Sequence, residues 1–331
     1  MRAKLNVTSA AIGGLLALSS ILYAYGAAAA DKIRMSTRAS DWDLVLIESG
    51  VAANYGLELE DVPMKAGTDV AEALIGGSID IASVGETPLT SLLTKSDAVG
   101  VVGTAVRTDG SYVKALVPMD SPYKTLMDLK GKKIATNIGA GSYRAFANWC
   151  EKNGLSINDF QILNTPPTAI LAALEAKAVD AAIWFAPTTT IAVQNGLVKV
   201  IGDFKGLADG QASWVVNREF AKANPDVVTR FVAATIEAQN ILVKDPAQAA
   251  KLIEQGMQRR GRIISAEQIQ PGFVDFDYSP EFDPKKSVAV FQVVFKGLAA
   301  EGKLSGEMPD FDKDMMPQFH ADAEKLVDQK K

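Results

Sequence analysis

Short apolar runs alternate along the chain with segments whose apolar residues recur at helical spacing. The runs predict strands at residues 33–37, 57–63, 79–84, 99–107, 133–136, 160–163, 181–184 and 198–201. The helical pattern predicts helices at residues 44–55, 70–75, 87–94, 143–152 and 169–176. This alternation is typical of an α/β domain, in which a mostly parallel sheet carries helices on both faces.

The pattern changes near residue 225, where helical spacing replaces the alternation. Helices are predicted at 225–244, 246–255 and 284–301, and each begins at a proline. Proline suits the first turn of a helix because its missing N–H would have no partner there. The chain therefore ends in a helical C-terminal segment.

Two stretches of the chain echo each other. Residues 71–88 read AEALIGGSIDIASVGETP, and residues 171–188 read LAALEAKAVDAAIWFAPT. Aligning them pairs Ala73 with Ala173, Leu74 with Leu174, Asp80 with Asp180, and Ala82 with Ala182. The echo predicts two similar α/β lobes. Ligands of open α/β sheets bind beyond the carboxyl ends of the strands, so one ligand would lie between the lobes.

The first thirty residues have the features of a secretory signal peptide. Arg2 and Lys4 form a positive start, 10–25 carries no charge, and 28–30 supplies small residues before Asp31. An uncleaved membrane anchor is the alternative, because 5–30 is long enough to span a bilayer. We expect cleavage near Ala30 and an exported, periplasmic product.

Composition narrows the classes of function. The chain has 34 Lys and Arg against 39 Asp and Glu, a net charge of −5; removing residues 1–30, with two basic and no acidic residues, leaves −7. An acidic chain argues against nucleic-acid binding. Cys150 and His320 are the only cysteine and histidine. Their small number argues against histidine-based catalysis and multi-cysteine metal sites, so we expect neither a cofactor nor a metal. Cys150 is expected in the core.

Three segments carry a resemblance to a known family: residues 76–89 (GGSIDIASVGETPL), 121–142 (SPYKTLMDLKGKKIATNIGAGS) and 174–196 (LEAKAVDAAIWFAPTTTIAVQNG). They resemble periplasmic solute-binding proteins of ABC importers. Specifically, they resemble the group that binds nitrate, sulfonates and taurine, which includes binders of thiamine precursors. The resemblance covers most of the chain from Asp31 to about Lys244.

The resemblance implies an α/β fold of two lobes, the type II periplasmic-binding-protein fold, with two crossover strands at Tyr112–Val117 and Ser213–Asn217. After the signal peptide at 1–30, lobe one would comprise 31–111 and 217–331, and lobe two would comprise 112–216. Such proteins close on a solute by a hinge motion. This one would act as a monomer and deliver its solute to an ABC permease in the inner membrane.

Candidate ligand contacts lie in the loops after the strands. Arg38, Ser40 and Trp42 follow the first strand, where Arg38 suits an anionic group and Trp42 can stack. Gly141, Ser142, Tyr143 and Arg144 begin a helix, with Ser142 as the predicted N-cap of an anion site. The remaining candidates are Gly85, Glu86, Thr87, Trp184, Pro187 and Trp214, with Asp109 and Tyr112 as weaker ones. Trp184 and Trp214 could equally be core residues.

Glu86 does not fit a purely anionic ligand, because a carboxylate beside an anion is costly. Arg38 or Arg144 could pair with it, it could face the cationic part of a zwitterion such as taurine or an amine-bearing heterocycle, or it could be solvated. Thr87 could cap its helix and also donate to the ligand.

We therefore predict a non-enzymatic protein that binds a small anionic or zwitterionic organic solute, similar to a sulfonate or taurine. A thiamine-precursor-like or other nitrogen-containing solute is the first alternative, and nitrate, bicarbonate and aromatic acids follow. An enzyme on the same fold and a ligand-sensing partner of a membrane receptor are the other classes considered.

Overall fold

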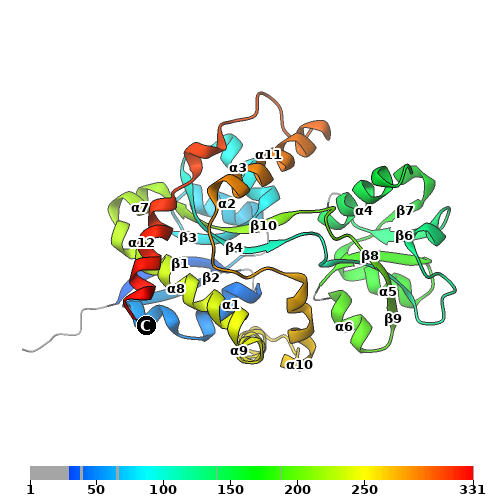
Figure 1. The fold of residues 1–331 in the computed structure, drawn as a ribbon, viewed down its shortest axis with the longest axis horizontal. Helices are drawn as coiled ribbons and strands as arrows, with labels where there is room; N and C mark the ends of the chain where they lie inside the picture. Colours follow the sequence, from blue (N-terminus) through cyan, green and yellow to red (C-terminus); the bar gives the residue numbers. More distant parts are fainter. Residues whose placement is uncertain (1–29, 38–39, 65–66, 139, 187, 331) are drawn as a thin grey trace, which may run out of the picture.

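The computed structural model describes residues 30–330, except residues 38, 39, 65, 66, 139 and 187. It contains two five-stranded sheets at opposite ends of an elongated molecule (Figure 1). The first sheet has the order β2-β1-β3-β10-β4, from β1 (Asp31–Thr37), β2 (Leu57–Pro63), β3 (Ile81–Gly85), β4 (Val99–Thr108) and β10 (Gly210–Asn217). The second has the order β7-β6-β8-β5-β9, from β5 (Val113–Pro118), β6 (Lys133–Thr136), β7 (Gln161–Asn164), β8 (Ala181–Phe185) and β9 (Val198–Asp203).

Each sheet contains one strand that runs against its neighbours. In the first sheet β10 pairs antiparallel with β3 and β4, and in the second β5 pairs antiparallel with β8 and β9. The two sheets therefore have the same strand order. The chain passes between them at residues 109–112 and 204–209, so β10 already lies in the first sheet where the sequence suggested a crossover strand. The three-part division of the chain into lobes stays a prediction.

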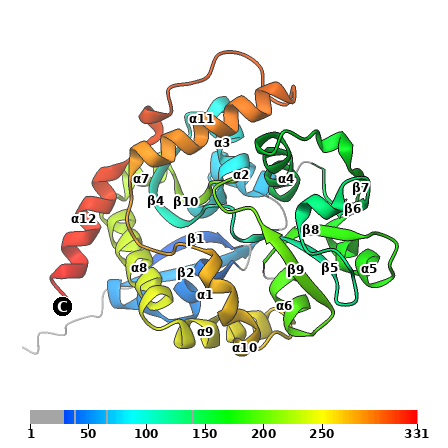
Figure 2. The ribbon, with the colours of Figure 1, turned by 45° about the vertical axis from the view of Figure 1, so that its right-hand side comes forward.

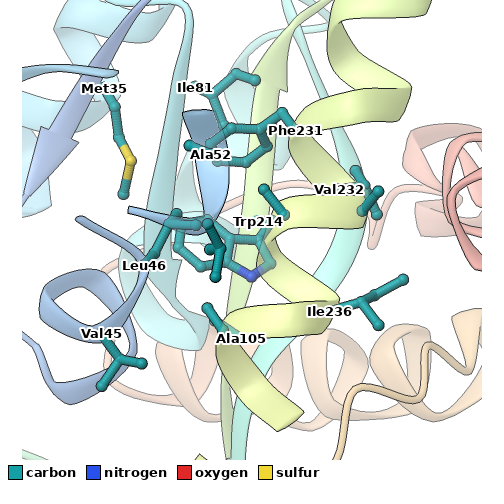
Figure 3. Packing of buried hydrophobic residues seen from close by; sticks show 14 of the residues in the cluster. Met35, Val45, Leu46, Ala52, Ile81, Ala105, Trp214, Phe231, Val232 and Ile236 are labelled. Carbon is teal, nitrogen blue, oxygen red and sulfur yellow. The ribbon is translucent and has the colours of Figure 1, made fainter. Parts of the chain in front are cut away.

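Helices cover both faces of the first sheet. One face carries α1 (Asp41–Glu48), α7 (Arg218–Ala223), α8 (Pro225–Lys244), α9 (Pro246–Arg259), α10 (Ala266–Ile269) and α12 (Pro317–Asp328). The other carries α2 (Gly67–Ile75), α3 (Glu86–Lys95) and α11 (Pro284–Ala300). Trp214 lies in the core between β10 and α8, close to Leu46 and Phe231 (Figure 3).

The second sheet is covered in the same way. α4 (Gly141–Lys152) packs on one face, and α5 (Ile170–Glu175) and α6 (Thr188–Gln194) pack on the other. Cys150 lies on the buried face of α4, and this burial raises the pKa of its thiol to about 11, which keeps the thiol protonated at neutral pH. Cys150 is therefore a core residue, as predicted.

Short 3₁₀ helices complete the fold at Val51–Tyr55, Leu126–Leu129, Ile157–Asp159, Pro167–Ala169, Gln270–Asp275 and Phe311–Asp314. The first of these corrects one prediction. The helix expected at 44–55 is split, because Gly50 adopts φ = 70°, a left-handed conformation that ends α1. None of the described helices has both the length and the apolar character to cross a membrane.

Candidate functional site

A cavity of about 460 Å³ lies between the two sheets, beyond the carboxyl ends of β1, β3 and β8. This volume is in the range of small-molecule sites. The first half of the chain contributes Ser40, Asp41, Trp42, Gly85, Glu86, Val106, Thr108 and Tyr112 to its lining. The second half contributes Phe185, Ala186, Gln211, Ala212, Ile253, Met257, Arg262, Ile264, Ile269, Gly272 and Phe276.

Two helices begin at this cavity. Ser40 and Gly85 are the N-cap residues of α1 and α3. The Ser40 side chain accepts no hydrogen bond from its helix, and Gly85 has no side chain that could. α4 begins nearby: its N-cap is Ala140, also without a side-chain cap, and a Cβ on Gly141 would lie 3.4 Å from the Tyr112 hydroxyl. The first N–H groups of a helix have no partner inside it, so they attract anions.

The charged residues of the lining are the carboxylates Asp41 and Glu86 and the guanidinium of Arg262. Arg144 Nη2 lies 3.5 Å from Glu86 Oε1, an ion pair that joins the two lobes. The Tyr278 hydroxyl donates to Asp41 Oδ2 at 2.9 Å, and burial raises the pKa of Asp41 above its usual value. Arg262 Nη1 contacts the Met257 sulfur at 3.8 Å and forms no ion pair with any described residue.

Aromatic rings form part of the wall. The Tyr112 ring centroid lies 5.8 Å from that of Phe185 and 5.5 Å from that of Phe276. Burial, with a smaller contribution from Glu86, raises the pKa of the Tyr112 hydroxyl, which therefore stays protonated and able to donate a hydrogen bond. The rings supply apolar area beside the polar helix ends.

The C-terminal segment closes one side of the cavity. α10 lies against α6 of the second lobe (Figure 2), where Gln194 Nε2 donates to the Glu267 carbonyl at 3.3 Å. This segment also brings Arg262 to the cavity, whereas the neighbouring Arg259 and Arg260 pair with Glu48. No local motif in the sequence marks one of the arginines at 259–262 as a lining residue.

A second depression, of about 980 Å³, lies beside the crossings between the sheets. Six of its charged residues pair with each other: Lys114 with Asp275 at 2.8 Å, Arg107 with Asp277 at 3.4 Å, and Lys205 with Asp109 at 3.8 Å. Because these charges already have partners, the smaller cavity is the better candidate. Among the described residues, no cluster of His, Cys, Asp or Glu side chains could hold a metal ion.

The structure brings several predicted contacts together. Ser40, Trp42, Gly85 and Glu86 line the cavity, and Arg144 pairs with Glu86, which is the paired alternative for that residue. Arg38 and Pro187 lie outside the described residues. Tyr143 and Thr87 are half-buried in the first turns of α4 and α3 and are not among the lining residues.

Two capping predictions are wrong. The N-cap of α4 is Ala140, and Ser142 lies buried in the first turn, with its hydroxyl 3.2 Å from that of Thr136. Similarly, Gly85 is the N-cap of α3, so Thr87 lies within the first turn. In both cases the N-cap lies two residues before the side chain that was expected to cap the helix.

The two tryptophans have different roles. Trp214 is fully buried, with its ring edge-on to Phe231 at a centroid distance of 5.5 Å, so it is a core residue away from the cavity. Trp184 is also buried, but its ring stacks on the cavity-lining Phe185 at 4.2 Å. It supports the wall from behind.

The family model "NMT1/THI5 like" matches residues 48–249. A putative aliphatic sulfonates-binding protein of Escherichia coli K12 is 25% identical over 320 residues, which is 90% of this chain and 99% of that protein. The taurine-binding periplasmic protein of the same strain is 25% identical over 218 residues, covering 65% of this chain and 67% of that protein.

Two solved structures have the same fold. The aliphatic sulphonate binding protein SsuA from Escherichia coli superposes with a TM-score of 0.73 at 24% identity, covering 86% of this chain and 92% of SsuA. A mutant of DSZB, a desulfurization enzyme, in complex with biphenyl-2-sulfinic acid gives 0.70 at 16% identity, covering 90% and 99%. The predicted two-lobe periplasmic-binding-protein fold is therefore confirmed.

Proposed function

The chain belongs to the NMT1/THI5-like family, and from this premise we propose that it is the extracytoplasmic solute-binding component of an ABC importer. Its solute is a small organic sulfonate, anionic or zwitterionic, which it captures between the two lobes and delivers to a permease in the inner membrane. It is exported to the periplasm, loses its leader near Ala30 and works as a monomer. The relatives named for sulfonate and taurine binding support this proposal.

The observation that carries the proposal is the meeting of helix N-termini at the cavity between the lobes. The N-caps of α1 and α3 line it without side-chain caps, so first-turn N–H groups are available to a ligand. The oxygens of a sulfonate accept such hydrogen bonds, and they suit the guanidinium of Arg262 as well. The aromatic rings beside them would hold the carbon part of the solute.

Binding is favoured over catalysis, although DSZB shows that enzymes occur on this fold. The single cysteine and the single histidine both lie away from the cavity. Cys150 is buried on the inner face of α4, and His320 Nε2 lies 2.7 Å from the Pro280 carbonyl oxygen. Neither residue could act as a nucleophile or a base on a solute in the cavity.

A thermal-shift panel tests the proposal. Residues 31–331 are unfolded and refolded to remove bound solute, then heated with alkyl and aryl sulfonates, taurine, nitrate, aromatic carboxylates and pyrimidine amines. A ligand at roughly a hundredfold over its dissociation constant adds about 2.7 kcal/mol, a shift of several degrees. We expect this shift with sulfonates, weakened in Arg262→Ala and unchanged in Lys251→Ala, a control at an exposed position of α9. A shift with amines alone, or with none of the compounds, would contradict the proposal.

A further inference from the structure

Asp41 is a carboxylate at the cavity that forms no ion pair with a described cation. It occupies the first turn of α1, lines the cavity between Ser40 and Trp42, and is half-buried. Its Oδ2 accepts the hydrogen bond from the Tyr278 hydroxyl at 2.9 Å. Among the described residues, Asp41 forms no ion pair and Oδ1 accepts no hydrogen bond.

Such a group is costly in the ligand-free protein. A carboxylate sheltered from water is destabilised unless a counter-charge or several donors stabilise it. One tyrosine hydroxyl and the positive end of α1 offset part of this cost. The other lining carboxylate, Glu86, already has Arg144 as its partner. The counter-charge that Asp41 lacks can therefore come from the solute.

The surroundings of Asp41 also suit a cation. Trp42, Tyr112 and Phe276 line the same cavity, and the faces of aromatic rings attract positive charge. Tyr278 is buried, with its ring 5.8 Å from that of Phe276 and 5.7 Å from that of Phe273. This packing fixes the tyrosine, so its hydroxyl holds the carboxylate in one orientation.

We propose that the solute carries a protonated amino group as well as its sulfonate, and that Asp41 selects for this group. The inference rests on the proposed function and narrows it to aminoalkyl sulfonates. The helix ends and Arg262 hold the sulfonate, Asp41 accepts hydrogen bonds from the ammonium group, and Tyr278 positions Asp41. A plain alkyl sulfonate would leave the Asp41 carboxylate without a partner.

Titration calorimetry with two matched solutes tests this proposal. Taurine (2-aminoethanesulfonate) and 2-hydroxyethanesulfonate differ only in the amino or hydroxyl group at one end. We expect the wild type to bind taurine at least about tenfold more tightly, because removing one partner of a buried charged hydrogen bond has effects of this size or larger. In Asp41→Asn this preference should disappear through weaker taurine binding, while the affinity for 2-hydroxyethanesulfonate changes less than about threefold.

Two further variants keep the test sharp. Tyr278→Phe retains the carboxylate but frees its orientation, so we expect a smaller loss of preference in the same direction. Asp226→Asn is the control, since Asp226 is an exposed aspartate of α8 that does not line the cavity. It should keep the preference for taurine. Circular dichroism and melting temperature confirm that each variant is folded.

The outcomes separate the two proposals. Three results would overturn the role of Asp41 and leave sulfonate binding intact. They are equal affinity of the wild type for the two solutes, a preference that survives Asp41→Asn, and a preference that is lost in Asp226→Asn. If no sulfonate binds but a pyrimidine amine binds and Asp41→Asn abolishes it, the role of Asp41 stands and sulfonate binding falls. Binding of neither class would overturn both.

Discussion

The loop after β3 and the loop after β8 reach the same cavity from opposite lobes with different chemistry. Gly85 and Glu86 form the first, and Phe185 and Ala186 form the second. The first offers a helix N-terminus and a charge, whereas the second offers an aromatic ring. The same supersecondary unit therefore supplies polar contacts from one lobe and apolar contacts from the other, which suits a solute with a charged head and a carbon part.

The two lobes have equivalent backbones around these loops. Asp80 Oδ2 accepts from the backbone N–H of Arg34 at 2.8 Å, and Asp180 Oδ2 accepts from the backbone N–H of Lys133 at 2.9 Å. Each aspartate thus joins the turn before its strand to the neighbouring strand. The first lobe adds a side-chain ion pair between Arg34 and Asp80, whereas in the second the Tyr123 hydroxyl lies 3.5 Å from Asp180 Oδ1.

The largest expected effect is on stability, at Trp214. Trp214→Ala leaves a cavity in the core of the first lobe and should lower the free energy of unfolding by about 3–5 kcal/mol. Solute affinity should be unchanged under conditions in which the variant is folded. Urea unfolding followed by circular dichroism measures the first quantity, and calorimetry the second. If Trp214→Ala weakened binding without lowering stability, Trp214 would be a cleft residue.

The second largest effect is the difference between Asp80 and Asp180 in their contribution to the free energy of unfolding. Asp80→Ala removes three charge-assisted hydrogen bonds and should cost about 3 kcal/mol, whereas Asp180→Ala should cost about 1 kcal/mol. Urea midpoints of the two variants compare them directly. Equal losses of stability in the two variants would show that the ion pair between Arg34 and Asp80 adds nothing to the stability of the first lobe.

The loop after β8 should contribute to the affinity for the solute. Phe185→Ala removes the ring that stacks on Trp184 and lines the cavity, and should weaken solute binding by about 1–2 kcal/mol, or five- to thirtyfold. Phe185→Leu keeps apolar area and should recover part of the affinity. Full affinity in Phe185→Ala would assign all of the binding to the first lobe.

The smallest effect concerns the pH dependence of stability. Because the folded-state pKa of Asp41 is raised by burial, the ionised residue opposes folding, and its protonated form does not. In solute-free protein, Asp41→Asn should therefore be more stable than the wild type at neutral pH. The difference should shrink as the pH falls through the folded-state pKa of Asp41 and vanish below its unfolded value. Thermal unfolding between neutral and acidic pH measures it, with Asp226→Asn, at an exposed residue, as the control.

Local patterns predicted much of the fold. β2, β6 and α8 begin and end where the sequence placed them, because prolines and the change of period mark their ends. The helix predicted at 44–55 was too long because the left-handed conformation of Gly50 overrides an uninterrupted apolar pattern. α6, α10 and α12 were not predicted, and α10 is a single short turn held by its neighbours.

The site was harder to predict than the fold. Ser40, Trp42, Gly85 and Glu86 could be found because they follow strands of the echoed unit. Arg262 and Phe276 could not, since they reach the cavity through the packing of the C-terminal segment against both lobes. Trp184 and Trp214 looked alike in the sequence, and only the neighbouring Phe185 and Phe231 distinguish them.

Titration calorimetry of taurine into refolded residues 31–331 tests the central claim most directly. The account predicts one taurine per chain, displaced by ethanesulfonate at higher concentration, and recovered chemically unchanged. Absence of binding by every sulfonate, or release of sulfite from the bound solute, would contradict it.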